Sequence, residues 1–247
     1  RVREQLERDV LPQLLPAQRW FGGNGQSIAS VTVRERGEWT IRGSDWVLAV
    51  ADVAFEDGAS HAYSLPLALA WETGDVSALA SLAHCTLARV RQLARVGILY
   101  DAFWDDAFVR AIVSTMARGA RDSVDGGELV YAHTARVPAM GESFAAAVAE
   151  PIRHPPFEQV NTLAVFGESL LLKGYRRLRL GINPEIELGR FLTAVSPCGS
   201  AAPLLGSLEY LAEDGERTAL AVLFGYVGNE GNGWDYTLAH LHRVVED

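Results

Sequence analysis

The sequence predicts an α+β protein with two units, residues 1–120 and 121–247. Three observations lead to this class. The chain of 247 residues is long enough to bury two small cores. Strand-like runs and amphipathic helices occur in both halves, and the polar, glycine-containing stretch 118–127 is typical of a linker. We therefore expect a small N-terminal α/β unit, followed by an antiparallel sheet with one packed helix.

A helix is expected at the start of the first unit. Apolar residues recur every four positions there, and the helix ends near Pro12 or Pro16. Strands bounded by turn residues are then predicted at 28–33, 39–41, 46–53 and 63–70. Periodicity leaves residues 76–97 open between helix and strand. Asp105 is a suitable N-cap for a further helix with one apolar face.

The second unit is predicted to contain more strands, at 128–135, 144–149, 162–166, 170–175 and 220–224. The third and fourth of these strands form a hairpin around Gly167 and Glu168. Asn183 and Pro184 mark the start of a helix, because Asn is a favoured N-cap and Pro suits the first helical position. A terminal amphipathic helix is expected from Trp234 onward.

The composition limits the partners. The net charge of −9 disfavours nucleic acid and anionic membranes, and no apolar run reaches the ~20 residues that span a bilayer. Cys85 and Cys198 lack the spacing of a zinc site or disulfide framework, which fits a reducing cytoplasm. The histidines show no metal-ligand pattern, so we assign no metal residue. Small molecules or proteins are the expected partners.

Lys173 is the only lysine among the 22 basic residues. A chain that uses arginine everywhere else would use it here if any cation sufficed. Lysine offers a compact ammonium that can bind phosphate oxygens in a narrow site, whereas arginine presents a wide planar fork. Lys173 shares a strand face with Leu171 and Tyr175, where an unpaired ammonium is costly. We therefore expect a carboxylate or a ligand at Lys173; the structural alternative is a lysine that reaches solvent from a sheet edge.

Two carboxylates in the first turn of the next helix are candidate partners for Lys173. Glu187 is preferred, because Glu185 stands where an acid can simply complement the helix dipole, but Glu185 stays open. The order of hairpin, lysine, acid-bearing helix and further strands is that of the nucleotide-binding lobe of protein-kinase-like phosphotransferases.

The loop before the hairpin is placed to cover phosphates with backbone N–H groups and short side chains. Its candidate residues are Gln159, Asn161 and Thr162. An ordinary turn is the alternative for this loop. We assign Arg176, Arg177 and Arg179 to solvated surface, and Trp20 to a small core.

Many stretches of the sequence resemble the N-terminal part of maltokinases, especially the kinase module fused to bacterial trehalose synthases. The resemblance rests on residues 18–23 (QRWFGG), 63–70 (YSLPLALA), 97–102 (GILYDA), 158–159, 161–162, Lys173, 176–177, 181–192 (GINPEIELGRFL), 203–206 (PLLG) and 233–238 (GWDYTL). These stretches follow one another through nearly the whole chain. The resemblance therefore depends on far more than a single motif.

The resemblance implies ATP-dependent phosphorylation of maltose to maltose 1-phosphate, on a route from trehalose toward α-glucan. It makes residues 1–120 a maltokinase-type cap and residues 121–247 a kinase-like nucleotide-binding N-lobe. By family order, the segment with Tyr226 and Val227 is the hinge that holds adenine. A helical C-lobe with the catalytic aspartate and the Mg²⁺ ligands follows in the family. No His-Gly-Asp or Asp-Phe-Gly-like string occurs here, so we expect the C-lobe to be absent and this chain alone to be inactive.

The sequence departs from the family pattern at several positions. Val160 and Leu163 stand where small hydroxyl residues are expected, and Gly174-Tyr175 replaces a larger apolar pair. Nucleotide preference is therefore open. Two other functions also stay open: a kinase of another sugar or aminosugar, and a non-catalytic module that positions a fused or associated trehalose synthase.

Overall fold

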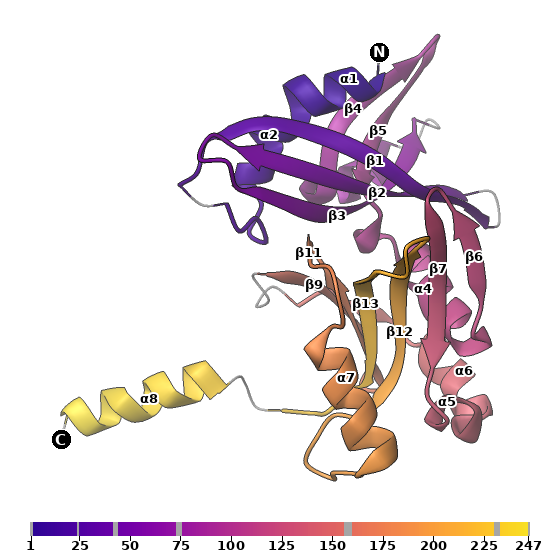
Figure 1. The fold of residues 1–247 in the computed structure, drawn as a ribbon, viewed down its shortest axis with the longest axis vertical. Coiled ribbons are helices and arrows are strands. Elements are labelled where there is room, and N and C mark those ends of the chain that lie inside the picture. The colour runs from indigo at the N-terminus through magenta and orange to yellow at the C-terminus, as the bar shows by residue number, and fades with distance from the viewer. Residues whose placement is uncertain are drawn as a thin grey trace.

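The fold is described from a computed structural model, which describes residues 2–23, 25–41, 44–72, 76–155, 160–229 and 233–246. Two antiparallel sheets lie one above the other, and helices cover their faces (Figure 1). This arrangement confirms the predicted α+β class, with a smaller unit at the N-terminus and an antiparallel sheet with a packed helix after it. The division at residue 120 stays a prediction.

The first sheet has the strand order β1-β2-β3-β5-β4. Its strands are β1 (Ile28–Ile41), β2 (Ser44–Phe55), β3 (Ser60–Trp71), β4 (Thr86–Gln92) and β5 (Arg95–Asp101). The helical segment from α1 (Val2–Gln5) to α2 (Leu11–Leu14) packs on it, because Leu11 and Leu15 share a core with alternating strand residues such as Val31 and Val53. The two strands predicted at 28–33 and 39–41 are one bulged strand. The ambiguous stretch 76–97 contains both α3 (Val76–Ser81) and strands.

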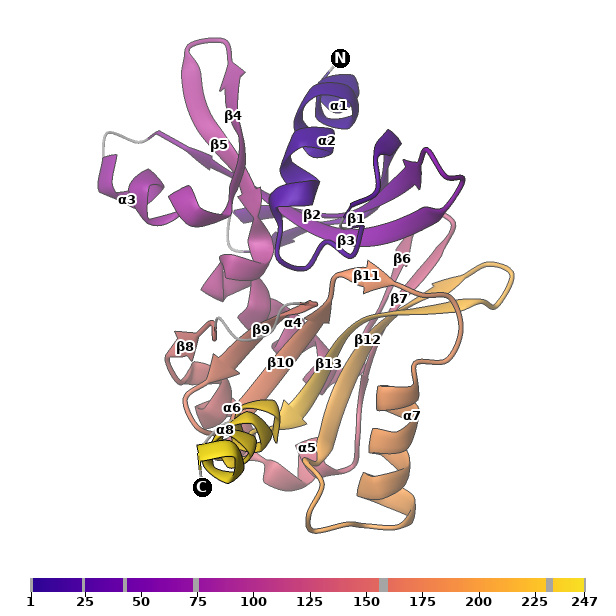
Figure 2. The same cartoon turned by 90° about the vertical axis from the view of Figure 1, so that its left-hand side faces the viewer.

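The second sheet has the order β6-β7-β12-β13-β10-β9-β8 (Figure 2). Its strands are β6 (Arg121–Val124), β7 (Gly127–His133), β8 (Ile152–Arg153), β9 (Asn161–Phe166), β10 (Leu170–Tyr175), β12 (Leu204–Ala212) and β13 (Arg217–Gly225). One face packs on α4 (Asp106–Arg118), α5 (Arg136–Met140) and α6 (Glu142–Ala149). The other face packs on α7 (Pro184–Arg190). The terminal helix α8 (Gly233–Glu246) lies apart from both sheets (Figure 1).

Two sequence predictions in this half are corrected, and one strand was missed. Residues 144–149 form helix α6 rather than a strand, because alanine favours helix and the buried Phe144 and Ala147 lie one helical turn apart. The expected linker at 118–127 is mostly a tight hairpin of β6 and β7. Strand β12 was not predicted at all. Among the residues that the structure describes, no helix is both long and apolar enough to cross a membrane.

Asp105 caps α4 as predicted and also ties it to the first sheet. Its Oδ1 accepts a hydrogen bond from the Ala107 backbone N–H at 2.8 Å. Its Oδ2 accepts from the Trp46 Nε1–H of β2 at 3.1 Å and from the Tyr100 hydroxyl of β5 at 3.0 Å. One carboxylate therefore satisfies a helix end and two largely buried aromatic donors.

Replacing Asp105 by alanine is expected to lower the free energy of unfolding by about 2–4 kcal/mol, since a cap is lost and two buried donors lose their acceptor. Urea denaturation measures this change. Asp106→Ala is the matched control: its carboxylate is exposed in the same helical turn, so its loss should cost less than about 1 kcal/mol. Equal losses in the two variants would contradict this role of Asp105.

The two sheets are joined by the segment that follows β10. The short strand β11 (Arg177–Leu178) pairs with β3 and so adds a strand from the second half of the chain to the first sheet. The Arg176 carbonyl accepts a hydrogen bond from the Ser64 N–H at 2.8 Å.

Arg176 is only 1% exposed, so its assignment to solvated surface was wrong. Its guanidinium bonds the Asp101 carboxylate, and its Nε donates to the Thr162 hydroxyl at 2.6 Å. It also lies 5.1 Å from the Trp20 ring centroid and 5.5 Å from that of Phe103. Arg176 is therefore a buried cation shared by both sheets.

Candidate functional site

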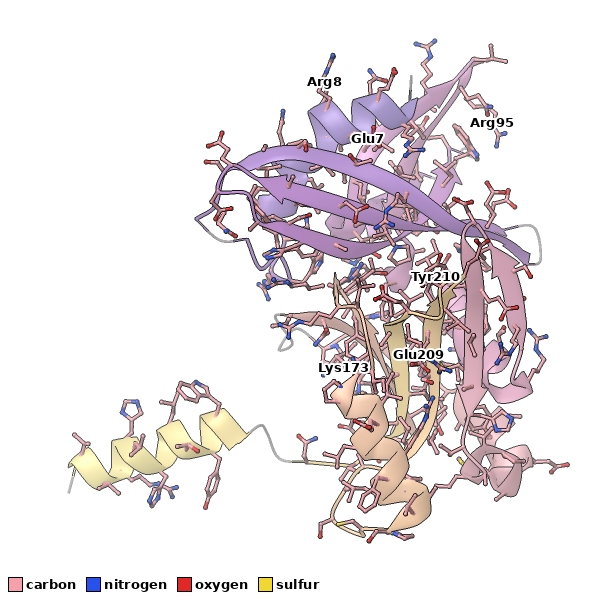
Figure 3. The ribbon with its side chains drawn as sticks, in the orientation of Figure 1. Glu7, Arg8, Arg95, Lys173, Glu209 and Tyr210 are labelled. Carbon is pink, nitrogen blue, oxygen red and sulfur yellow. The ribbon has the colours of Figure 1, made fainter. Side chains whose placement is uncertain are left out.

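Lys173 lies in the middle of the second sheet, between β9 and β13. It is paired with Leu163 on one side and Val222 on the other. Leu170 and Leu172 of the same strand are fully buried against the α4 side. Because side chains alternate along a strand, Lys173 points to the opposite face, toward α7, as Figure 3 shows.

The partner of Lys173 is Glu185, at the start of α7. The Lys173 Nζ lies 3.2 Å from Glu185 Oε2 and 3.3 Å from Oε1. The preferred prediction, Glu187, was therefore wrong, and the alternative, Glu185, is the partner of Lys173. The Asn183 side chain accepts the Glu185 N–H at 2.9 Å, which sets the first turn of the helix beside β10. Glu187 lies two residues further, roughly 200° around the helix, and is exposed.

Tyr175 is a third member of this group. Its hydroxyl donates to Glu185 Oε2 at 2.8 Å, and its ring centroid lies 5.9 Å from Lys173 Nζ. Burial and the neighbouring Glu185 carboxylate raise the pKa of Tyr175, which keeps the hydroxyl a neutral donor. Two donors therefore fix the carboxylate. Sequence reasoning missed this role, although the spacing of two residues from Lys173 on one strand was the available signal.

The predicted phosphate loop is only partly described, because Gln159 lies outside the described residues. Asn161 is paired with Tyr175 and so shares the face of Lys173. Thr162 is paired with Gly174 and points to the other face, where it is 7% exposed and accepts from Arg176. The structure therefore brings Asn161 toward Lys173 and corrects the placement of Thr162.

Tyr226 and Val227 follow β13 at the other end of the site. The Tyr226 N–H donates to the Ser169 carbonyl at 2.9 Å, and Gly225 is paired with Leu170. Leu170 is three residues before Lys173 on β10, so the segment lies about 10 Å from Lys173 along that strand. The Tyr226 hydroxyl accepts from Arg153 at 2.9 Å, while Val227 is exposed.

The Lys173 group has partial access to solvent. The side chains of Lys173 and Glu185 are 19% and 39% exposed. A lysine ammonium has three protons to donate, so the Lys173 ammonium can donate to a further acceptor besides the Glu185 carboxylate.

The part of the chain that forms most of the first sheet matches a known protein family. Residues 14–105 match the family model of the maltokinase N-terminal cap domain. The match runs from the end of α2 through the strands β1 to β5 and stops just before α4. The N-terminal part of the chain is therefore maltokinase-like. Lys173, Glu185 and Tyr175 lie outside the matched residues.

His154 lies near the start of β9 and is the most enclosed imidazole with a described environment on this side of the molecule. Its Nδ1 donates to the Leu163 carbonyl at 3.0 Å, and its Nε2 is buried 3.9 Å from Asp106 Oδ1. Burial lowers the pKa of His154, against smaller opposing effects of Leu163, Asp106 and Asp101. His154 is therefore neutral in the folded protein at neutral pH.

This environment predicts a pH dependence of stability. Because the folded-state pKa of His154 is below its unfolded value of about 6.5, the unfolded state binds more protons as the solution becomes acidic. The contribution of neutral His154 to the free energy of unfolding is complete above about pH 6.5, and it is lost as the pH falls through the lower folded-state pKa. Denaturation curves measured between neutral and mildly acidic pH should show that His154→Gln loses less free energy of unfolding than the original chain as the pH falls. The exposed His133→Gln is the control; if both variants change the slope equally, His154 is not responsible.

Proposed function

We propose that the Lys173 group binds the phosphates of ATP, and that this chain forms the cap and nucleotide-binding lobe of a maltokinase-type sugar kinase. The pairing of the chain's single lysine with Glu185 carries the proposal. A helix carboxylate that orients a strand lysine is the arrangement with which kinase-like lobes hold nucleotide phosphates.

The geometry gives each element a role. Glu185, fixed by Tyr175, holds the ammonium of Lys173 in one position, so the cation need not be ordered again when phosphate binds. Asn161, on the same face, is the side chain of the preceding loop best placed to contact the phosphates. Since the Tyr226 N–H is already bonded, the backbone of Val227 is the proposed contact for adenine.

The proposed reaction transfers the γ-phosphoryl group of ATP to maltose, giving maltose 1-phosphate and ADP. The maltokinase-type cap supports this acceptor. Transfer also needs Mg²⁺, which neutralises charge on the phosphates. No group of three acidic, histidine or cysteine side chains among the described residues could hold this ion, so we assign no metal step to them.

Titration calorimetry with ATP tests the nucleotide site. The chain should bind ATP, and Glu185→Gln should weaken binding by about tenfold, or 1.4 kcal/mol, because the lysine loses its orienting charge. Glu187→Gln is the matched control, two residues along the same helix, and should leave the affinity unchanged. Absence of ATP binding, or equal effects of the two variants, would overturn the site.

The acceptor is tested separately, in the complete gene product. Phosphorus NMR should detect maltose 1-phosphate formed from ATP and maltose, and Lys173→Met should abolish it. A phosphorylated product from another sugar, with none from maltose, would support the kinase and reject the acceptor.

A further inference from the structure

A pocket of about 500 Å³ lies at the junction of the two sheets. Residues from both halves line it, from the turn after α2 and the loop before β4 to the start of β9. Lys173 and Glu185 do not line it. Asn161 does line it, so the pocket borders the proposed nucleotide site at this residue without containing the Lys173–Glu185 pair. Its volume is in the range of about 300–1,000 Å³ of small-molecule sites.

Two tryptophans from the first half form part of the pocket wall. Trp104 lies between two imidazoles, with ring centroids 4.8 Å from His84 and 4.7 Å from His154. Trp20 is held by Tyr63, with ring centroids 5.8 Å apart. Both indoles are half-buried and fixed by neighbouring rings. The two indoles therefore give the wall rigid apolar surface.

The charges in the buried wall are cancelled or absent. The Asp101 carboxylate is paired with Arg176. Burial keeps His154 neutral, and burial together with Asp101 raises the pKa of Cys85 to about 11, so this group stays a thiol. A phosphate ligand would be repelled by the Asp101 carboxylate. A cationic ligand would gain little from this carboxylate, because Arg176 already pairs with it. Arg19 also lines the pocket but is exposed, so it is the buried part of the wall that favours a neutral ligand.

The polar groups of the pocket suit hydroxyl groups. Gln18 and Asn161 supply amides, which both donate and accept hydrogen bonds. The His84 Nδ1 lies 3.0 Å from the Ser81 carbonyl, which assigns the proton to Nδ1 and leaves Nε2 as an acceptor. Amides, an imidazole acceptor and aromatic walls together match a ligand with many hydroxyls and flat C–H faces.

We infer that this pocket binds a neutral saccharide. The inference does not require Lys173 to bind ATP. Asp101 and Thr162, two partners of the Arg176 guanidinium, also line the pocket. A bound saccharide would contact the groups that join the two sheets, so it should raise the melting temperature of the chain.

Titration calorimetry of the 247-residue chain with maltose and cellobiose tests this inference. At least one disaccharide should bind. His84→Ala and Gln18→Ala, which change two lining residues from different segments of the chain, should each weaken binding about three- to tenfold. The matched control is His133→Ala. This exposed histidine lies on β7 and also bonds a backbone carbonyl through Nδ1. Its replacement should leave the affinity for the disaccharide unchanged.

Each other outcome overturns the inference. If neither disaccharide binds, the pocket is not a saccharide site. If binding survives both pocket variants, the saccharide binds elsewhere. If adenosine binds instead and the two variants weaken it, the pocket takes a nucleoside. Lys173→Met separates this site from the proposed function, because it should leave saccharide binding intact even if ATP binding is lost.

Discussion

Replacing Arg176 by methionine is expected to lower the free energy of unfolding by about 3–5 kcal/mol, the usual cost of removing one partner of a buried ion pair. Arg176 is 1% exposed, and its guanidinium bonds Asp101 and Thr162, which come from different sheets. Methionine fills much of the same space, but among the described residues the Asp101 carboxylate would keep only its bond from the Phe103 N–H. Chemical denaturation monitored by tryptophan fluorescence measures this loss.

Arg177→Met is the control for this experiment. Arg177 is the next residue and is only half-buried, and its guanidinium contacts the imidazole of His61. Its loss should cost less than about 1 kcal/mol. Adding Asp101→Asn to the Arg176→Met variant should recover part of the lost stability, because the unpaired charge is removed. A loss as small as that of Arg177→Met would show that Arg176 does not join the sheets.

Lys173→Met is expected to weaken ATP binding by about 100-fold, or 2.8 kcal/mol, since the phosphates lose their charge-assisted partner. Lys173→Arg should also fail to restore full affinity. The ammonium lies 3.2 Å from Glu185 Oε2 and 5.9 Å from the Tyr175 ring centroid. A planar guanidinium there would form a two-pronged pair with the carboxylate instead of facing a ligand. Calorimetric titration with ATP compares the two variants.

A control for charge alone is Arg121→Met, on the distant edge strand β6, where the side chain is 59% exposed. It removes one positive charge but should not change ATP affinity. If Lys173→Arg binds ATP as well as the original chain, the argument from the single lysine fails even though the site is correct. If Lys173→Met binds equally well, the site itself is wrong.

Patterns within one element were predicted well from the sequence. The caps at Asp105 and Asn183 follow from local hydrogen bonding, which depends on neighbouring residues alone. The face of Lys173 follows from the two-residue period of a strand. The hairpin of β9 and β10 was also found, because its turn lies between two apolar runs.

Contacts between elements were not predictable in the same way. Glu185 and Glu187 both suit the first turn of α7, and only the packing of that helix on β10 selects Glu185. Arg176 and Asp101 are 75 residues apart, so no local pattern connects them. Thr162 was placed in a polar loop, but the register of β9 turns its hydroxyl inward. These choices depend on tertiary structure, which propensity and periodicity do not describe.

The pairing of β11 with β3 affects how the cap could be exchanged between proteins. A transplanted cap that ended at residue 120 would lack the strand that covers Ala62 and Tyr63, and so would present an open sheet edge that invites aggregation. The donor cap and the recipient lobe must therefore match at Arg176–Leu178 as well as at the chain junction. Engineers who recombine such halves should treat this short segment of the recipient as part of the graft.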